Sequence, residues 1–394
     1  MAAGFGAAPV RGLAQRLAPG KTRWPGAPAS LATSDAAFVG AVAACWDEAC
    51  EGLARAHGRP GVPAIAAVLP LVAERDGTLG EALAAVHFAY EIGGRLGEVM
   101  RIKPGMHVDA TWPSLGSAAG AAAALALDDD GVLGAIDLAA AQMPASLYLP
   151  VAQGATGRNV FLGHAARLGT DCAIALSAGF VPPRDAVEAC RRFVLEAGTP
   201  LRLADPALSL IQEGYLKPYA AVRHVHYGAA AASELRRHVV DALDRIERIE
   251  LQVYREALTY CGNRAPATTI QAQFSLSFGV AAMLVLGDLS PAAYRLLDDP
   301  QLRALESKVV LAEDCELTAR GARGATLELL VDGRLLRKSV ETVPGDPGRA
   351  LSAAEARDKC ARYAGPVLGV REATGLFDTV MSAPAHAPLR ELLT

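Results

Sequence analysis

The sequence has little net charge, few aromatic residues and no long hydrophobic run. Lys and Arg number 38 against 42 Asp and Glu, a formal charge of -4, so no overall positive field attracts nucleic acid. The longest apolar stretch, residues 118–127, ends in three aspartates and falls short of the ~20 residues that span a bilayer. We therefore expect neither a nucleic-acid partner nor a membrane segment.

Sequence motifs for common cofactors, metals and nucleophiles are also missing. The chain has no Walker loop, no G-x-G-x-x-G after a predicted strand, no H-E-x-x-H and no G-x-S-x-G. Its seven cysteines are an odd, scattered set without a C-x-x-C pair, which favours free thiols over disulfides or a zinc site. We expect a cytoplasmic protein with no cofactor and no metal.

The residues that are abundant predict a helical protein with more than one domain. A chain of 394 residues exceeds the roughly 250–300 that one hydrophobic core serves. Alanine and leucine dominate a composition that is 52% hydrophobic, and these residues favour helices. Apolar residues recur at helical spacing in the first half, and we expect a bundle with helices over residues 35–56, 63–74, 78–100, 112–127 and 131–142.

The pattern changes after Pro206. Strands are predicted where apolar residues alternate or branch at Cβ, and Asp332-Gly333 between two such runs is a strong hairpin signal. We expect strands over residues 248–254, 308–311, 325–331 and 334–340, and helices over residues 229–243, 270–286, 291–305 and 352–363. The predicted fold class is mostly α with an inserted α+β lid. The expected domains are a helical domain at 1–212, the lid at 213–345, and C-terminal helices at 346–394 that return to the helical domain.

Two groups of polar residues stand out as candidate site residues. Asp47, Glu48 and Glu51 follow an apolar helix and precede His57, although a solvated helix end would show the same pattern. Basic residues gather near the expected domain junction, where they could bind carboxylates or simply form a charged hinge. The candidates near this junction, and in two loops that precede it in the sequence, are His107, Arg158, Lys217, Arg223, His224 and His226.

The chain resembles the MmgE/PrpD family of 2-methylcitrate dehydratases and cis-aconitate decarboxylases. The resemblance runs from about Leu31 to the C-terminal helices and rests on the order and spacing of several short motifs. They are Ala36-Ala37-Phe38 with Gly40, Tyr90-Glu91 with Arg95-Leu96, Gly163 with Ala165-Ala166, Ala178-Gly179-Phe180, Leu216-Lys217-Pro218-Tyr219, Ala272-Gln273-Phe274-Ser275-Leu276, and Leu351-Ser352 with Lys359. The resemblance implies a large helical domain, a smaller α+β lid and an active site in the cleft between them.

The resemblance also implies which residues form the site. The family's catalytic aspartate corresponds by position to Asp47, its histidines to His57 and His107, and its lid lysine to Lys217. Arg158 stands where the family has a lysine, and we add Arg223, His226 and Ser275 as substrate-binding residues. The chain departs from the family pattern at Ala49, Cys50, Glu51 and Phe278, and from its Pro-Cys-Cys at Ala220-Ala221-Val222.

These residues predict a cofactor-independent lyase that acts on a small di- or tricarboxylate. The reaction expected is proton abstraction next to a carboxylate, with cations stabilising the charge that develops and histidines acting as base and acid. Which histidine is the base stays open. The alternatives are an epimerase or decarboxylase of a related dicarboxylate, and an inactive relative that only binds one. The family resemblance also implies a homodimer.

Overall fold

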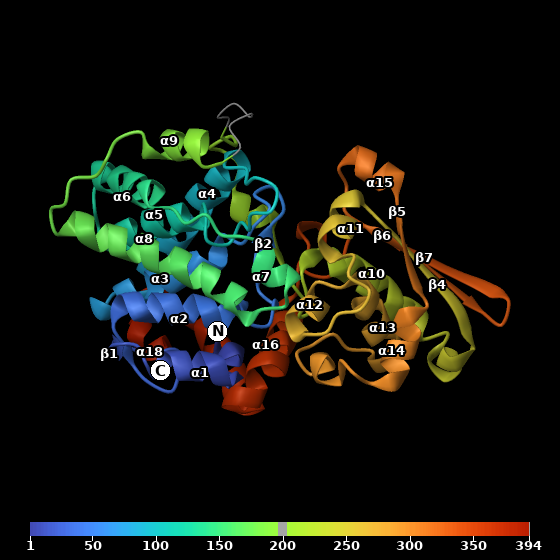
Figure 1. Cartoon of the computed structure of the whole chain (residues 1–394). Helices are drawn as coiled ribbons and strands as arrows, with labels where there is room; N and C mark the ends of the chain where they lie inside the picture. Colours follow the sequence, from blue (N-terminus) through green and yellow to red (C-terminus); the bar gives the residue numbers. More distant parts are fainter. Residues whose placement is uncertain (196–202, 394) are drawn as a thin grey trace.

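The computed structural model describes residues 1–195 and 203–393. It consists of two lobes (Figure 1). The first, which we call the helical lobe, contains α1 to α9, and the C-terminal helices α16 to α18 lie against it. The second, the mixed lobe, contains α10 to α15 and a four-stranded sheet. The expected fold class, mostly α with a smaller α+β part, is confirmed.

The helical lobe packs around α5, whose alanine and glycine residues permit close approach of neighbouring helices. A Cβ on Gly116 would lie 2.8 Å from the Cα of Gly93 on α4, so only glycine fits at this crossing. The helices of this lobe are α1 (Ala8–Ala14), α2 (Thr33–Cys45), α3 (Gly61–Glu74), α4 (Leu79–Val99), α5 (Pro113–Ala124), α6 (Asp129–Ala141), α7 (Leu149–Ala152), α8 (Phe161–Ser177), α9 (Ala186–Phe193), α16 (Ala353–Leu368), α17 (Val370–Ser382) and α18 (Leu389–Leu393). Every described helix is too short or too polar to span a bilayer.

Four expected helices differ from the structure. The helix predicted over residues 291–305 is a 3-10 turn at Ala293–Leu296 followed by the separate helix α14, because Asp299 caps a new helix that begins at Pro300. The helix predicted over residues 35–56 ends at Cys45, because the backbone of Glu48 adopts a left-handed conformation with φ 52°. The helix predicted over residues 270–286 is broken before Ser275, whose hydroxyl accepts the Phe278 N–H and begins a new helix. The helix predicted over residues 229–243 begins earlier, at Arg223, and ends at Arg236.

The mixed lobe contains a sheet with the strand order β5-β4-β6-β7, in which only the β4–β5 pair is parallel. The predicted hairpin is confirmed: Asp332 and Gly333, with φ 48° and 71°, form the two-residue turn between β6 and β7. The elements are α10 (Arg223–Arg236), β4 (Ile246–Val253), α11 (Arg255–Cys261), α12 (Thr269–Gln273), α13 (Leu276–Leu286), α14 (Pro300–Ser307), β5 (Val309–Glu313), α15 (Cys315–Arg320), β6 (Ala325–Val331) and β7 (Arg334–Val340).

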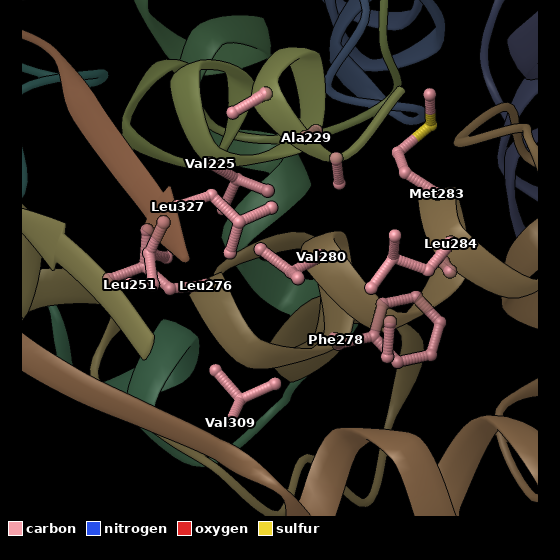
Figure 2. Close-up of a cluster of buried hydrophobic side chains, with 14 of the residues drawn as sticks. Val225, Ala229, Leu251, Leu276, Phe278, Val280, Met283, Leu284, Val309 and Leu327 are labelled. Carbon is pink, nitrogen blue, oxygen red and sulfur yellow. The ribbon is translucent and has the colours of Figure 1, made fainter. Parts of the chain in front are cut away.

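The core of the mixed lobe lies between its sheet and the helices α10 and α13 (Figure 2). Side chains from five elements meet there, so the core holds the sheet and both helices together. The labelled members are Val225 and Ala229 of α10, Leu251 of β4, Leu276, Phe278, Val280, Met283 and Leu284 of α13, Val309 of β5 and Leu327 of β6. This core fixes α10, whose first residues reach the junction between the lobes.

A small second sheet, which was not predicted from the sequence, lies at the junction. Strand β2 (Glu51–Leu53) pairs antiparallel with β3 (Gly214–Leu216), and the backbone N–H of Lys217 then donates to Cys50 O at 3.0 Å. Another strand, β1 (Pro19–Thr22), lies in the N-terminal part of the chain. The β2–β3 pair ties the segment that begins the expected lid to the helical lobe.

Candidate functional site

A cluster of five buried charged residues lies at the junction of the lobes. Each of the five side chains is at most 7% exposed, which is unusual for ionised groups unless they are paired. The cluster consists of Glu48, Arg59, Asp109, Arg158 and Lys217. We call it the buried charge cluster.

Glu48 is at the centre of the buried charge cluster. Its Oε1 accepts a hydrogen bond from Arg59 Nη1 at 2.9 Å and another from Arg158 Nη1, and its Oε2 accepts from Lys217 Nζ at 2.8 Å. Asp109 forms the second acidic point, since its Oδ2 pairs with Arg59 Nη2 and with Arg158 Nη2, the latter at 3.3 Å. Two carboxylates thus hold three cations, which leaves one positive charge in excess.

The electrostatics of the cluster keep its members ionised. Burial raises the pKa of Glu48, but Arg158, Arg59 and Lys217 lower it more, and its pKa lies well below the usual range. Burial lowers the pKa of Lys217, but the combined attraction of Glu48 and of neighbouring groups such as Cys50 is larger, and the pKa of Lys217 is raised. Lys217 is therefore a fixed cation and not a base at neutral pH.

Strained turns and the second sheet position these residues. Glu48 and His57, at φ 52° and 53°, are left-handed non-glycine residues that flank β2, a conformation that costs about 1–2 kcal/mol per residue. His57 ends a short turn closed by hydrogen bonds between Leu53 and Gly58. Such strain is common at functional sites, where the surrounding structure holds it in place.

A cavity of about 130 Å³ opens beside the buried charge cluster, and we call it the central cavity. Both lobes contribute to its wall, and two neighbouring cavities share His57 and Glu256 with it. The chargeable and histidine residues in its lining are Glu48, Asp109, Glu256, Arg59, Arg158, Lys217, Arg223, Arg323, His57, His107 and His224. Cations outnumber carboxylates in this wall, so it suits an anionic ligand.

The three histidines of the central cavity have different surroundings. His57 Nδ1 lies 3.5 Å from Oε1 of Glu256 in the mixed lobe, and this contact is the main reason that the pKa of Glu256 is lowered to about 2. His107 Nδ1 accepts the backbone N–H of Asp109 at 3.1 Å, and burial lowers the pKa of His107 to about 4. His224 Nδ1 lies 2.5 Å from the Tyr254 hydroxyl, and burial lowers the pKa of His224 to about 3.

Comparison with protein-family models identifies most of the chain. A model of the MmgE/PrpD N-terminal domain matches residues 5–197, and a model of the MmgE/PrpD C-terminal domain matches residues 219–381. The chain belongs to the MmgE/PrpD family. A comparison with curated proteins gave no match. Membership of the MmgE/PrpD family supports a dehydratase-like or related enzyme.

The structure of this MmgE/PrpD protein brings together five of the eight residues predicted for the site. His57, His107, Arg158, Lys217 and Arg223 all line the central cavity. They come from both lobes, and the first and the last of them are more than 150 residues apart in the sequence.

The other three predicted residues lie elsewhere in the described structure. Asp47 is outside the cavity lining, and its neighbour Glu48 takes the buried position, because the left-handed turn ends the helix on which Asp47 and Glu51 were expected to share a face. His226 is fully buried, with its Nε2 3.0 Å from Ala221 O. Ser275 caps α13 and donates to Asn263 O at 2.7 Å.

Sequence reasoning missed several residues that line the central cavity. Arg59, Asp109, Glu256 and Arg323 were not singled out, and Glu48 and His224 were noted without a role. Asp109 had a local signal, since it lies two residues after His107. Glu256 and Arg323 had none, because only the packing of the mixed lobe brings them to the cavity.

The buried histidines predict that acid destabilises the protein. The pKa values of His107 and His224, about 4 and about 3, lie below the 6.5 of an unfolded histidine. Their contribution is complete above pH 6.5 and is lost as the pH falls toward 4, because only the unfolded chain then binds the protons. As the pH falls from 6.5 to 5, protonation of each histidine in the unfolded chain should lower the free energy of unfolding by about 1–2 kcal/mol.

Urea unfolding at a series of pH values measures this loss. His224→Gln should make the decline with pH shallower, whereas the same change at the exposed His386 should leave it as in the wild type. An equal decline in the wild type and in His224→Gln would contradict the assignment.

Proposed function

We propose that the protein is a cofactor-independent, dehydratase-type lyase that acts on a small di- or tricarboxylate in the central cavity. The observation that carries the proposal is a cavity wall in which fixed cations stand beside neutral histidines. Cations bind the carboxylates, and neutral imidazoles are able to move a proton at neutral pH. The site lies between two lobes, where ligand sites are frequent.

The cations offset the weak acidity of the proton that the proposed reaction removes. A proton next to a carboxylate is weakly acidic, because removing it adds charge to a group that is already negative. Lys217 and Arg158 are buried at the cavity wall and stay protonated, so they are in place to stabilise the developing charge without reorganisation. The low dielectric of a buried site strengthens this effect.

The polar contacts of the histidines support separate roles. His57 Nδ1 faces the Glu256 carboxylate, so we assign its proton to Nδ1, which leaves Nε2 free to act as the base. His107 Nδ1 accepts a backbone N–H, so we assign its proton to Nε2, which makes the neutral ring a hydrogen-bond donor. The proposal is therefore that His57 abstracts the proton and, once protonated, returns it to the departing hydroxyl, which leaves as water while His107 donates a hydrogen bond to it.

An epimerase is the second candidate, because two histidines line one cavity. Proton removal by one ring and return by the other would invert a carbon centre without loss of water. Decarboxylation and binding without turnover are further outcomes that the experiment below separates.

Proton exchange in heavy water tests the proposed function. The protein is incubated with citrate-like, malate-like and iminodisuccinate substrates, with and without EDTA, and followed by NMR. Loss of water, with or without chelator, supports the lyase. Exchange with no net product identifies an epimerase, and loss of carbon dioxide identifies a decarboxylase. Binding without exchange at any candidate would overturn the proposed catalysis.

The His57–Glu256 pair leads to a kinetic prediction. His57→Gln should lower turnover about 100-fold, as expected for a lost base. Glu256→Gln should lower it about 10-fold, because Glu256 is a positioning residue that holds the tautomer of His57. In the double variant the loss should not exceed that of His57→Gln alone, since the two residues act as one unit.

The division of the loss between kcat and KM separates positioning from a structural role for Glu256. Glu256→Gln should lower kcat and leave KM within about threefold of the wild type, because a lost orientation of the base affects the chemical step and not the binding of the substrate. Additive losses in the double variant, or a higher KM with an unchanged kcat, would contradict the pairing.

A further inference from the structure

Arg223 has guanidinium donors that are buried and unused. The residue is 3% exposed, and its Nη2 pairs with Asp346. Its Nε and Nη1 have no hydrogen-bond partner among the described residues. The guanidinium lies over the rings of Tyr215 and Tyr227, at 4.6 Å and 5.3 Å from their centroids, so it is held in one orientation. A buried donor without a partner is costly, and a bound anion would satisfy it.

Arg323 is the second cation on this side of the central cavity. It lies between α15 and β6, and its side chain is 19% exposed. Its Nη2 is 3.6 Å from Oε2 of Glu256, beyond hydrogen-bond distance. Both arginines line the central cavity, and both belong to the mixed lobe.

The charges of the central cavity divide between the lobes. Arg59, Arg158 and Lys217 are hydrogen-bonded to Glu48 and Asp109 in the buried charge cluster. The mixed-lobe wall adds two guanidinium groups and the single carboxylate of Glu256. Asp346, which is outside this lining, pairs with only one edge of Arg223. The helical-lobe side keeps one cation in excess, whereas Glu256 and Asp346 together match the charge of the two mixed-lobe arginines. The capacity of the mixed-lobe wall for an anion therefore lies in Nε and Nη1 of Arg223, which have no hydrogen-bond partner among the described residues.

We propose that Arg223 and Arg323 form a carboxylate subsite that binds the substrate's second carboxylate, remote from the reacting carbon. The inference rests on the proposed function, because it presumes that the first carboxylate lies beside Lys217 and Arg158. A planar guanidinium donates two parallel hydrogen bonds to a carboxylate. The ligand class is therefore a dicarboxylate whose two charged ends bind opposite walls of the cavity.

Calorimetric binding tests this subsite without the need for turnover. The probes are malonate, succinate and glutarate, with propionate as the monocarboxylate. Arg323→Gln and Arg223→Lys should weaken the dicarboxylate that binds best by about 10–100-fold, the usual effect of a lost charged hydrogen bond. Propionate binding should change less than threefold. Arg320→Gln is the matched control, because Arg320 ends α15, pairs with Glu341 on the surface and lies outside the cavity lining.

Several outcomes would overturn the subsite. They are unchanged dicarboxylate affinity in both variants, an equal loss for propionate, or no dicarboxylate binding by the wild type. Circular dichroism confirms that each variant is folded. Proton exchange in the wild type with unchanged affinity in the variants would reject the subsite and keep the proposed function. Dicarboxylate binding that depends on the two arginines, without proton exchange in any candidate substrate, would reject the proposed function and keep the subsite.

Discussion

Replacing Glu48 with alanine is expected to lower the free energy of unfolding by about 3–5 kcal/mol. Glu48 accepts hydrogen bonds from Arg59, Arg158 and Lys217, and all of these side chains are buried. Without Glu48, three buried cations would share the single carboxylate of Asp109. Urea unfolding, monitored by circular dichroism, measures the change.

The neighbouring Asp47 supplies the matched control. It is an acid in the same turn, but it lies outside the buried charge cluster, so Asp47→Ala should cost about 1 kcal/mol or less. The double variant Glu48→Gln with Lys217→Met should recover part of the loss, because it removes a cation together with the carboxylate. Equal losses for Asp47→Ala and Glu48→Ala would contradict the central position of Glu48.

Lys217→Ala is expected to lower kcat/KM about 1000-fold, with a lower turnover and a higher apparent substrate constant. Both constants change because the same ammonium binds the ground-state carboxylate and stabilises the charge that develops on it. Lys217→Arg should retain more binding than turnover, since a planar guanidinium does not replace a point charge. Steady-state kinetics on a confirmed substrate measures both constants.

Lys359 provides a control for the loss of a lysine near the same turn. Its Nζ donates to Ala49 O at 2.6 Å, and it lies outside the central cavity lining. Lys359→Ala should therefore reduce stability while leaving kcat/KM within about threefold of the wild type. Unchanged constants in Lys217→Ala would mean that Lys217 only neutralises Glu48.

The sequence predicted the regular elements better than the turns between them. Apolar residues at helical spacing predicted α3 to α6, and Asp332-Gly333 predicted the β6–β7 hairpin, because these signals are local in the sequence. The end of α2 was missed because Glu48 is left-handed, and the tertiary contacts of its carboxylate fix that conformation. The residues next to Glu48 in the sequence do not predict such a turn.

The candidate site was predictable only in part for the same reason. Family resemblance supplied His57, His107, Arg158 and Lys217, whose positions match the family pattern. Choosing between Asp47 and Glu48 required the three-dimensional turn, because the two acids are adjacent in sequence. Arg323 required the packing of α15 against the rest of the mixed lobe, which no short motif encodes.

The β2–β3 pairing attaches the backbone of Lys217 to the helical lobe. Its N–H bonds to Cys50 O, and its ammonium bonds to Glu48. Arg223 begins α10 only six residues later and belongs to the mixed lobe. A hinge motion between the lobes would therefore leave Lys217 in place and carry Arg223, Glu256 and Arg323 away from it.

This arrangement has a consequence for dividing the protein into fragments. The first family match ends at residue 197 and the second begins at residue 219, so Lys217 and β3 belong to neither match. A fragment cut to the first match would present β2 as an open edge and leave Glu48 without one of its three cations. Mixing the two fragments would not rebuild the site. A chain cut after Lys217, by contrast, would keep the buried charge cluster whole in its first half.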